Sequence, residues 1–356
     1  MIDAVVGKIK ELQNTINRPV RLMEVCGTHT VAIFRHGIRD LLPEGIQLLS
    51  GPGCPVCVTS IRDVDRVIAI SMAKDVIMTT FGDMMRVPGN NKSLSHAKSE
   101  GGDIRIVYSP LDALEMAKSN KGKKVVFFAA GFETTSPLVA GTISEAERSA
   151  IDNFYVYSVH KTVPPALKAL LDSGEVLVDG FILPGHVSTI IGKNPYNFIA
   201  HDYYKSAVIT GFEASDILIG IMMILEQMVK ENPIVENQYT RVVKDEGNRK
   251  AVSIMNTYFG PSDAEWRGLG ILPGSGLELR RQFHHRDIRS VLNPDVPEGK
   301  EPKACSCGEV LKGIKIPTDC GLFGKACTPE KPVGACMVSS EGSCSAYYKY
   351  MGMKGR

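Results

Sequence analysis

Short apolar runs alternate with polar turns along most of this chain. The N-terminal segment 3–17 is amphipathic and predicts a helix with apolar side chains at helical spacing: Val5, Ile9, Leu12 and Ile16. Eight apolar runs of strand length follow, and each ends in a small or polar cluster: 21–25, 46–49, 75–80, 104–108, 124–130, 154–159, 181–183 and 207–210. A repeated order of strand, turn and helix is typical of an α/β protein with a parallel sheet.

The same pattern starts twice. Four apolar runs precede residue 110 and four more begin at residue 124, which predicts two similar parallel-sheet α/β domains facing a cleft. We expect the first domain at 1–120, the second at 121–232, and a connecting segment with a cysteine-rich C-terminal domain at 233–356. The segment 293–303 holds three prolines and mixed charge, and is the expected linker into the cysteine-rich end.

The ends of the predicted strands carry most of the reactive side chains. In parallel α/β sheets, ligands bind beyond the carboxyl ends of the strands. Those ends hold eight polar or thiol residues: Cys26, His29, Cys54, Cys57, Asp83, Glu133, His186 and Glu213. Helix capping explains Asp83, Glu133 and Glu213 equally well when each is taken singly. A cleft between facing domains would gather the whole set into one site.

The clearest chemistry lies in the segment Gly51-Pro52-Gly53-Cys54-Pro55-Val56-Cys57. Two thiols at this spacing can close a reducible ring or bind one metal ion. Between the end of a strand and the start of a helix, the positive helix end lowers a thiol pKa toward the reactive thiolate. We therefore expect an accessible, low-pKa thiol in the Cys54–Cys57 pair. A structural pair and half of a zinc site are the alternative interpretations.

Composition and charge narrow the class of protein. Of the 356 residues, 44% are hydrophobic and 22% are charged, as in ordinary folded proteins. A formal net charge of +2 gives no general basic field, so neither nucleic acid nor an anionic membrane is an expected partner. No apolar segment approaches the roughly 20 residues of a membrane span, and the start lacks a signal-peptide pattern. We expect a cytoplasmic protein without a disulfide framework.

The nine cysteines form two groups. Three lie near the N-terminus, at Cys26, Cys54 and Cys57, and six lie in the tail: Cys305, Cys307, Cys320, Cys327, Cys336 and Cys344. No His follows His285, so a metal centre in the tail would be held by thiolates alone. The tail matches neither a zinc ribbon with two CxxC knuckles nor the common ferredoxin runs. Zinc and an iron–sulfur cluster both stay open, with two cysteines left over in either case.

Five motifs resemble the HypD family of hydrogenase maturation proteins: Cys26-Gly27-Thr28-His29-Thr30, the Gly51 to Cys57 segment, Thr80-Phe81-Gly82-Asp83-Met84, Gly131-Phe132-Glu133-Thr134-Thr135 and Pro184-Gly185-His186-Val187-Ser188. The tail from Gly334 to Cys344 also fits. The resemblance implies an assembly scaffold with redox chemistry rather than a conventional metabolic enzyme. Its product would be the iron part of NiFe-hydrogenase active sites, an iron carrying cyanide and carbon monoxide. The implied partners are a HypC-like small chaperone, a HypE-like cyanide donor and, indirectly, the hydrogenase large subunit.

The resemblance also implies how the tail cysteines divide. The family spacing C-x14-C-x6-C-x16-C assigns four ligands of a four-iron four-sulfur (4Fe-4S) cluster: Cys305, Cys320, Cys327 and Cys344. Cys307 and Cys336 are then the spare pair, which would pass electrons from the cluster toward the cleft.

The same resemblance implies the roles at the strand ends. Cys26 would bind the transient iron, with His29 close enough to orient or assist it. Cys54 and Cys57 would cycle between dithiol and disulfide. Two further residues complete the expected site, Glu133 and His186.

Two other classes of function compete with the scaffold. One is a free-standing iron–sulfur thiol–disulfide oxidoreductase of the ferredoxin–thioredoxin reductase kind, which would have no need of Cys26-Gly27-Thr28-His29. The other is a zinc-stabilised binding module without electron transfer.

Overall fold

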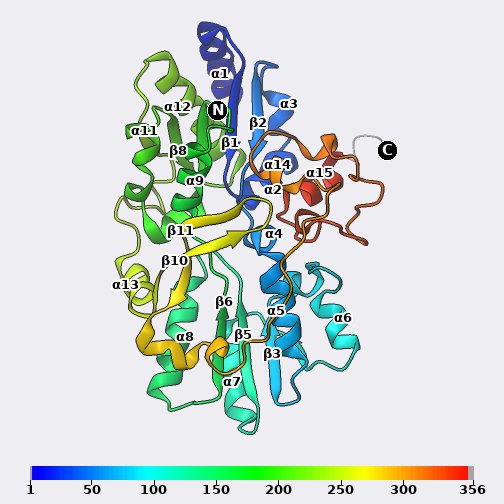
Figure 1. Cartoon of the computed structure of the whole chain (residues 1–356). Coiled ribbons are helices and arrows are strands. Elements are labelled where there is room, and N and C mark those ends of the chain that lie inside the picture. Colours follow the sequence, from blue (N-terminus) through cyan, green and yellow to red (C-terminus); the bar gives the residue numbers. More distant parts are fainter. Residues whose placement is uncertain (1, 352–356) are drawn as a thin grey trace.

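The structure is a computed structural model that describes residues 2–351. Two parallel sheets form its framework, one above the other in Figure 1. Sheet I contains, in spatial order, β2 (Ile46–Ser50), β1 (Val20–Glu24), β7 (Gly180–Pro184), β8 (Ser206–Thr210) and β9 (Val235–Asn237). Sheet II contains β4 (Ile104–Ile106), β3 (Val76–Thr80), β5 (Lys124–Ala129) and β6 (Phe154–Ser158). The predicted parallel α/β class is confirmed, and all eight predicted runs form strands.

Strand pairing does not follow the two halves of the sequence. The first two runs form β1 and β2, and β1 pairs with β7 from the second half. The chain leaves sheet I after β2, builds all of sheet II, and returns to sheet I with β7. Each sheet therefore takes strands from both halves. The domain boundaries at residues 120 and 232, and a cleft between the domains, stay predictions.

Helices cover both sheets. The predicted N-terminal helix is confirmed as α1 (Ile2–Ile16), which packs against α12 (Ala214–Val229). The remaining helices are α2 (Gly27–Arg35), α3 (Ile38–Leu41), α4 (Pro55–Val58), α5 (Ile61–Ser71), α6 (Leu94–Ser99), α7 (Pro110–Ser119), α8 (Ser136–Arg148), α9 (Val163–Asp172), α10 (Gly185–Ile191), α11 (Phe198–His201), α13 (Arg249–Tyr258), α14 (Cys307–Leu311) and α15 (Ser343–Met351). Within residues 2–351, none of these helices has the length and apolar character needed to cross a membrane.

An antiparallel hairpin lies between the levels of the two sheets (Figure 1). It consists of β10 (Phe259–Trp266) and β11 (Gly270–Leu279), which the sequence pattern did not predict. Its buried Trp266 stacks on Phe132 with ring centroids 6.0 Å apart, and the indole N–H donates to Ser275 Oγ at 2.7 Å. An isolated bridge joins Trp266 to Thr59, just after the CxxC pair. The hairpin thereby holds the CxxC segment against the end of sheet II.

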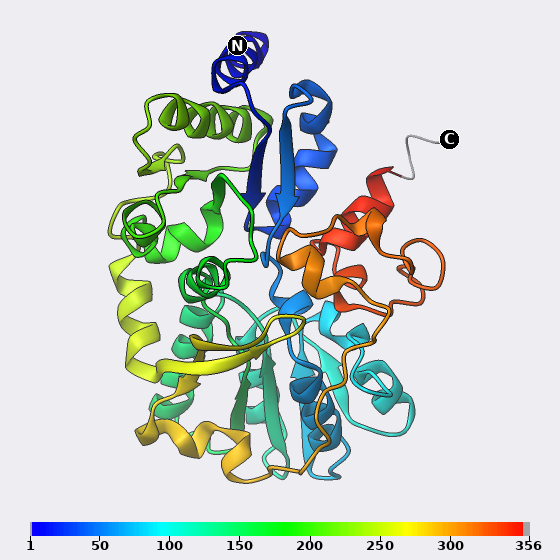
Figure 2. The ribbon, with the colours of Figure 1, turned by 45° about the horizontal axis from the view of Figure 1, so that its top comes forward.

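The tail lies beside α2 and α4 in both ribbon views (Figures 1 and 2). The expected linker 293–303 forms no helix or strand, and it passes α5, where a Cβ at Gly299 would lie 2.9 Å from the Cβ of Ile61. The short 3-10 helix η6 (Ala335–Met337) contacts α4, and α15 packs on α2.

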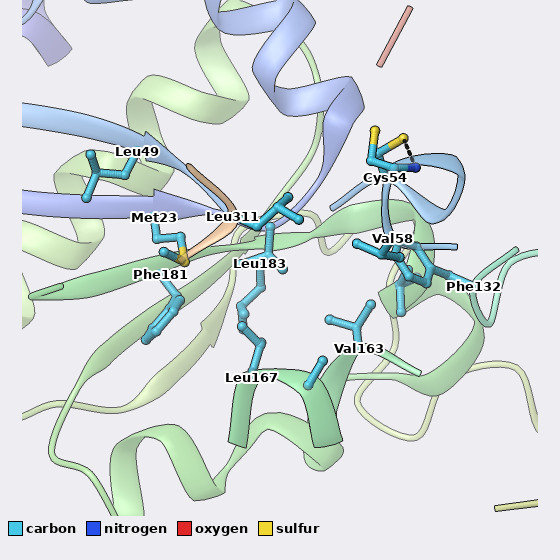
Figure 3. Packing of buried hydrophobic residues seen from close by; sticks show 14 of the residues in the cluster. Met23, Leu49, Cys54, Val58, Phe132, Val163, Leu167, Phe181, Leu183 and Leu311 are labelled. Carbon is cyan, nitrogen blue, oxygen red and sulfur yellow. Dashed lines mark hydrogen bonds between the residues drawn. The ribbon is translucent and has the colours of Figure 1, made fainter. Parts of the chain in front are cut away.

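The tail shares an apolar core with sheet I. One buried cluster joins Met23 and Leu49 of the sheet to Leu311 and Cys336 of the tail. Figure 3 shows part of this cluster around the carboxyl ends of the strands, with Cys54 and Val58 at its edge. The tail thus buries its apolar side chains against the rest of the chain. The expected separate cysteine-rich domain stays a prediction.

Candidate thiol and metal site

Two cysteine motifs meet at the end of sheet I. Strands β1 and β2 are parallel neighbours in register, with Glu24 opposite Ser50, so the loops after them start side by side. The N–H of Gly27 donates to the carbonyl of Gly53 at 3.0 Å. A Cβ at Gly53 would lie 2.3 Å from the backbone nitrogen of Cys26, so only glycine allows this approach. The loops that carry Cys26 and Cys54 are therefore in direct backbone contact.

Cys26 is a buried thiol at the start of α2. It is 8% exposed, and burial raises its pKa to about 12, against a smaller lowering by the backbone of His29 and Thr28. A metal that binds this sulfur must displace a firmly held proton, because the thiolate is the ligand form.

His29 and His186 stack on the same aromatic ring. Their ring centroids lie 4.6 Å and 3.9 Å from that of Phe212, which follows β8. His29 is fully buried, whereas His186 is exposed to solvent. The structure thus joins two predicted residues through Phe212, a contact that sequence reasoning missed.

The tautomer of His29 follows from its partners. Its Nε2 lies 2.9 Å from the carbonyl of Gly211 and 2.9 Å from Thr210 Oγ1, while Nδ1 is buried without a partner. Burial lowers the pKa of His29 to about 4, so the ring is neutral at pH 7. Because a carbonyl only accepts, Nε2 carries the proton and Nδ1 presents a free lone pair.

The expectation of an accessible thiol in the CxxC pair is wrong, because both side chains are buried. Cys54 and Cys57 are 4% and 1% exposed, and burial raises the pKa of Cys57 well above its usual value. The N–H of Cys57 donates to Cys54 Sγ at 3.3 Å, drawn as the dashed line in Figure 3. Helix α4 is only four residues long, so desolvation by the covering tail outweighs the effect of its positive end.

Five of the six tail cysteines line one small apolar cavity: Cys305, Cys307, Cys320, Cys327 and Cys344. The four ligands assigned by family spacing are all among them. A Cβ at Gly334 would lie 2.5 Å from Cys307 Sγ and 2.9 Å from Cys305 Sγ, so only glycine leaves room for these sulfurs. The N–H of Val333 donates to Cys327 Sγ at 3.3 Å; burial raises the pKa of this thiol, and the contact with Val333 opposes that rise.

The donor set fits an iron–sulfur cluster. All nine cysteines are free thiols, and the cavity around the tail sulfurs is apolar. Among residues 2–351, no group of three or more His, Cys, Asp or Glu side chains is arranged to hold a metal ion. A four-iron cluster is larger than one ion, and it would need thiols distributed around a cavity as these are.

Cys336 stands apart from the cavity and links the two sulfur groups. It is fully buried, shares one buried cluster with Cys57 and Cys307, and interacts with both of these thiols. Those two contacts hold the pKa of Cys336 below its usual range. Cys336 therefore interacts with a thiol of each group, Cys307 of the tail and Cys57 of the CxxC pair, and Cys54 is adjacent to Cys57.

The three strand-end carboxylates have different surroundings. Glu213 caps α12 through a capping box with Asp216, so the capping interpretation holds for it. Asp83 accepts from Ser339 Oγ at 2.8 Å and so contacts the tail. Glu133 is 2% exposed, and its Oε1 accepts from the N–H of Val163 at 2.9 Å while Oε2 has no partner.

Glu133→Gln is expected to make folding stability less sensitive to pH. Burial raises the pKa of Glu133 from 4.5 to about 7, so the unfolded chain loses this proton before the folded chain does. The stability that the neutral carboxyl contributes is complete below pH 4.5 and is lost as pH rises toward 7. Between pH 4.5 and 8, the free energy of unfolding of the variant should rise relative to that of the native chain by on the order of 3 kcal/mol. Urea unfolding at both pH values measures the gain, and an equal difference at both would contradict it.

Two carboxylates near Cys26, one buried and one half-buried, were not predicted. Glu24 of β1 is fully buried; its Oε1 accepts from Thr30 Oγ1 at 2.6 Å, and burial raises its pKa to about 7. Glu341 of the tail accepts from Thr28 Oγ1 at 2.7 Å, and a Cβ at Gly27 would lie 2.3 Å from its carbonyl oxygen. A charged residue inside an apolar run was the available signal for Glu24. The contact of Glu341 depends on how the tail folds, so no local sequence pattern could have predicted it.

These features define a parallel α/β protein in which two groups of free thiols lie next to each other. Residues 1–351 match the HypD family, described as "Hydrogenase formation hypA family". The chain belongs to the HypD family.

Curated relatives cover nearly the whole chain. The hydrogenase maturation factor HypD of Rhodobacter capsulatus is 48% identical over 345 residues, 96% of this chain and 92% of the relative. HypD of Escherichia coli (strain K12) is 44% identical over 351 residues, 98% of this chain and 94% of the relative. The hydrogenase expression/formation protein HupD of Azotobacter chroococcum is 46% identical over 342 residues, 94% of this chain and 90% of the relative.

Proposed function

We propose that this chain is a hydrogenase maturation factor that serves as scaffold and redox partner in assembling an iron bearing two cyanides and one carbonyl. The proposed partners are a HypC-like small chaperone and a HypE-like cyanide donor, with the hydrogenase large subunit as the indirect recipient. The scaffold acts in the cytoplasm and contacts neither nucleic acid nor membrane. Membership of the HypD family and the names of its curated relatives support the process.

The observation that carries the proposal is the contact of three sulfur groups at one place. Cys26 lies against the Gly53 loop, Cys54 and Cys57 follow that loop, and Cys336 connects Cys57 to Cys307 at the tail cavity. A simple thiol reductase needs the interacting thiols Cys54, Cys57, Cys336 and Cys307, but it has no use for Cys26. A scaffold that binds iron and changes its redox state needs both.

Each group has a defined role. Cys26 holds the substrate iron through its thiolate, a soft donor suited to iron with cyanide and carbonyl. His29 keeps an unpaired Nδ1, which would act as an acceptor that orients a bound group. Glu133 and His186 would be the other polar residues around the proposed iron site.

The tail residues would hold the resident cofactor. Four thiolates bind the 4Fe-4S cluster: Cys305, Cys320, Cys327 and Cys344. When bound, that cluster supplies single electrons. The disulfide form of Cys54 and Cys57 holds two electrons and two protons fewer than the dithiol form, and those two electrons would go to the substrate iron while its ligands are installed. Thiol–disulfide exchange between Cys57 and Cys336, and then between Cys336 and Cys307, moves the disulfide bond to the tail and restores the Cys54–Cys57 dithiol. No electrons are gained or lost in these exchanges.

Infrared spectroscopy of the copurified complex tests the proposed function. This chain, produced anaerobically with a HypC-like chaperone and a HypE-like donor, should show bands of iron-bound cyanide and carbonyl. A brown protein with an iron–sulfur spectrum and no such bands would favour the free-standing thiol oxidoreductase. A colourless protein containing zinc would favour the binding module.

A further inference from the structure

Arg267 lies where the CxxC segment and the tail meet. Its backbone N–H donates to the carbonyl of Val58, the residue after Cys57, at 2.9 Å. The next residue, Gly268, packs on the tail backbone, since a Cβ there would lie 2.8 Å from the Cα of Gly308. Gly308 follows Cys307 in α14. Arg267 is therefore fixed by its backbone between the two groups of thiols.

The Arg267 guanidinium is buried and mostly unpaired. The residue is 3% exposed, and only Nη2 has a partner, the carbonyl of Pro88. Nε and Nη1 are buried without a hydrogen-bond acceptor. Within the part of the chain that the structure describes, Arg267 forms no ion pair. A buried cation with two free donors is costly, so an anionic partner is expected at this position.

The surroundings show where the negative charge would come from. Four groups act electrostatically on Arg267: Glu301, Cys307, Cys336 and Cys305. Glu301 is exposed, and its carboxylate already accepts from the N–H of Gly268 at 3.1 Å. The other three are tail thiols, two of which line the sulfur cavity. The unpaired donors thus lie within electrostatic reach of the proposed cluster site.

We propose that Arg267 is the counter-charge of the tail sulfur centre and raises its reduction potential. This inference rests on the proposed function, in which the tail cysteines hold an iron–sulfur cluster. One-electron reduction of a thiolate-held cluster adds one negative charge and breaks no bond to cysteine. A fixed cation, together with N–H donors to the sulfurs, stabilises the reduced state more than the oxidised state. Guanidinium remains charged at every relevant pH, so its effect is constant.

Arg267→Gln tests the proposal through the midpoint potential of the cluster. We expect a fall equivalent to about a tenfold loss in the one-electron equilibrium constant, or about 59 mV, measured by redox titration monitored by electron paramagnetic resonance. Arg267→Lys keeps the charge but not the planar donors, and should recover part of the shift. Iron and sulfide analysis and thermal melting confirm that each variant is loaded and folded.

Glu301→Gln is the complementary variant. Removing this exposed carboxylate leaves the positive charge of Arg267 less compensated, so the midpoint potential should rise. This variant keeps the proposal testable if Arg267→Gln fails to load a cluster. Arg148→Gln, at the exposed end of α8, is the matched control for loss of one positive charge and should leave the potential unchanged.

The possible results separate this inference from the proposed function. A loaded Arg267→Gln protein with the native potential, or a Glu301→Gln protein with an unchanged or lowered potential, would overturn the role of Arg267 and leave the scaffold function standing. Absence of iron and sulfide from the native protein would overturn both. Shifts of opposite sign in the two variants, with Arg148→Gln unmoved, would establish the role.

Discussion

Cys327→Ala is expected to yield a protein without its iron–sulfur cluster and with much lower stability. Cys327 is 7% exposed at the wall of the sulfur cavity, and its Sγ accepts from the N–H of Val333. Its backbone also closes a turn, with the N–H donating to Leu322 O at 2.9 Å and the carbonyl accepting from Gly324 N–H at 3.1 Å. The variant loses a ligand from a segment whose folding is coupled to metal binding.

The loss should exceed the effect of an ordinary buried substitution. Such changes cost about 0.5–3 kcal/mol, whereas loss of the cluster removes the binding free energy that holds the whole tail together. Iron and acid-labile sulfide content, visible absorption and thermal melting measure the outcome. Full iron and sulfide content in Cys327→Ala would contradict the ligand assignment.

Cys336→Ala is the matched control, because this cysteine is also buried but lies outside the cavity lining. It should retain the cluster and its colour. Cys305 and Cys307 both lie at the cavity beside Gly334, so their alanine variants identify the fourth ligand. The family spacing predicts that only Cys305→Ala loses the cluster.

The strands could be predicted from sequence, whereas their partners could not. A run such as 124–130 is apolar, short and followed by a polar turn that begins at Gly131, so local composition is enough to identify β5. Pairing of β1 with β7 joins segments more than 150 residues apart and depends on the whole chain. The repeated pattern of strands and helices suggested two consecutive domains. It holds no information on which sheet each strand joins, so it could not predict the observed pairing.

The cysteines of the site could be predicted, whereas their surroundings could not. Motif and spacing identified Cys26, the CxxC pair and the tail thiols, since reactive groups stand out among apolar runs. Burial of Cys54 and Cys57 depends on how the tail covers them, so the expected accessibility of this pair was wrong, and burial raises the pKa of Cys57 instead of lowering it. Arg267 follows the buried Trp266 in an unpredicted hairpin, and nothing local distinguishes it from a surface arginine.

Cys26→Ala is expected to abolish retention of the iron that bears cyanide and carbonyl, with little change in the fold. The side chain of Cys26 makes no capping hydrogen bond to α2, and the hydrogen bond from Gly27 N–H to Gly53 O is made by the backbone. The packing cost should therefore be only about 1 kcal/mol. A missing metal ligand has no such local substitute, because the neighbouring thiols, Cys54 and Cys57, belong to the redox pair.

Infrared spectra of the copurified complex measure the outcome directly. The Cys26→Ala protein should keep the visible absorption of its tail cluster and should still copurify with its HypC-like chaperone. It should show none of the cyanide and carbonyl bands of the native complex. His29→Ala should weaken those bands less completely, as expected of a group that orients a ligand without binding the metal.

The retained cluster and chaperone serve as internal controls in that experiment. Their loss in Cys26→Ala would indicate a structural role for the thiol, because the tail contacts the same loop through Glu341 and Thr28. Bands at native intensity in the variant would contradict iron binding by Cys26. The chain would then be an electron donor to its partners, and the iron would be held by the chaperone alone.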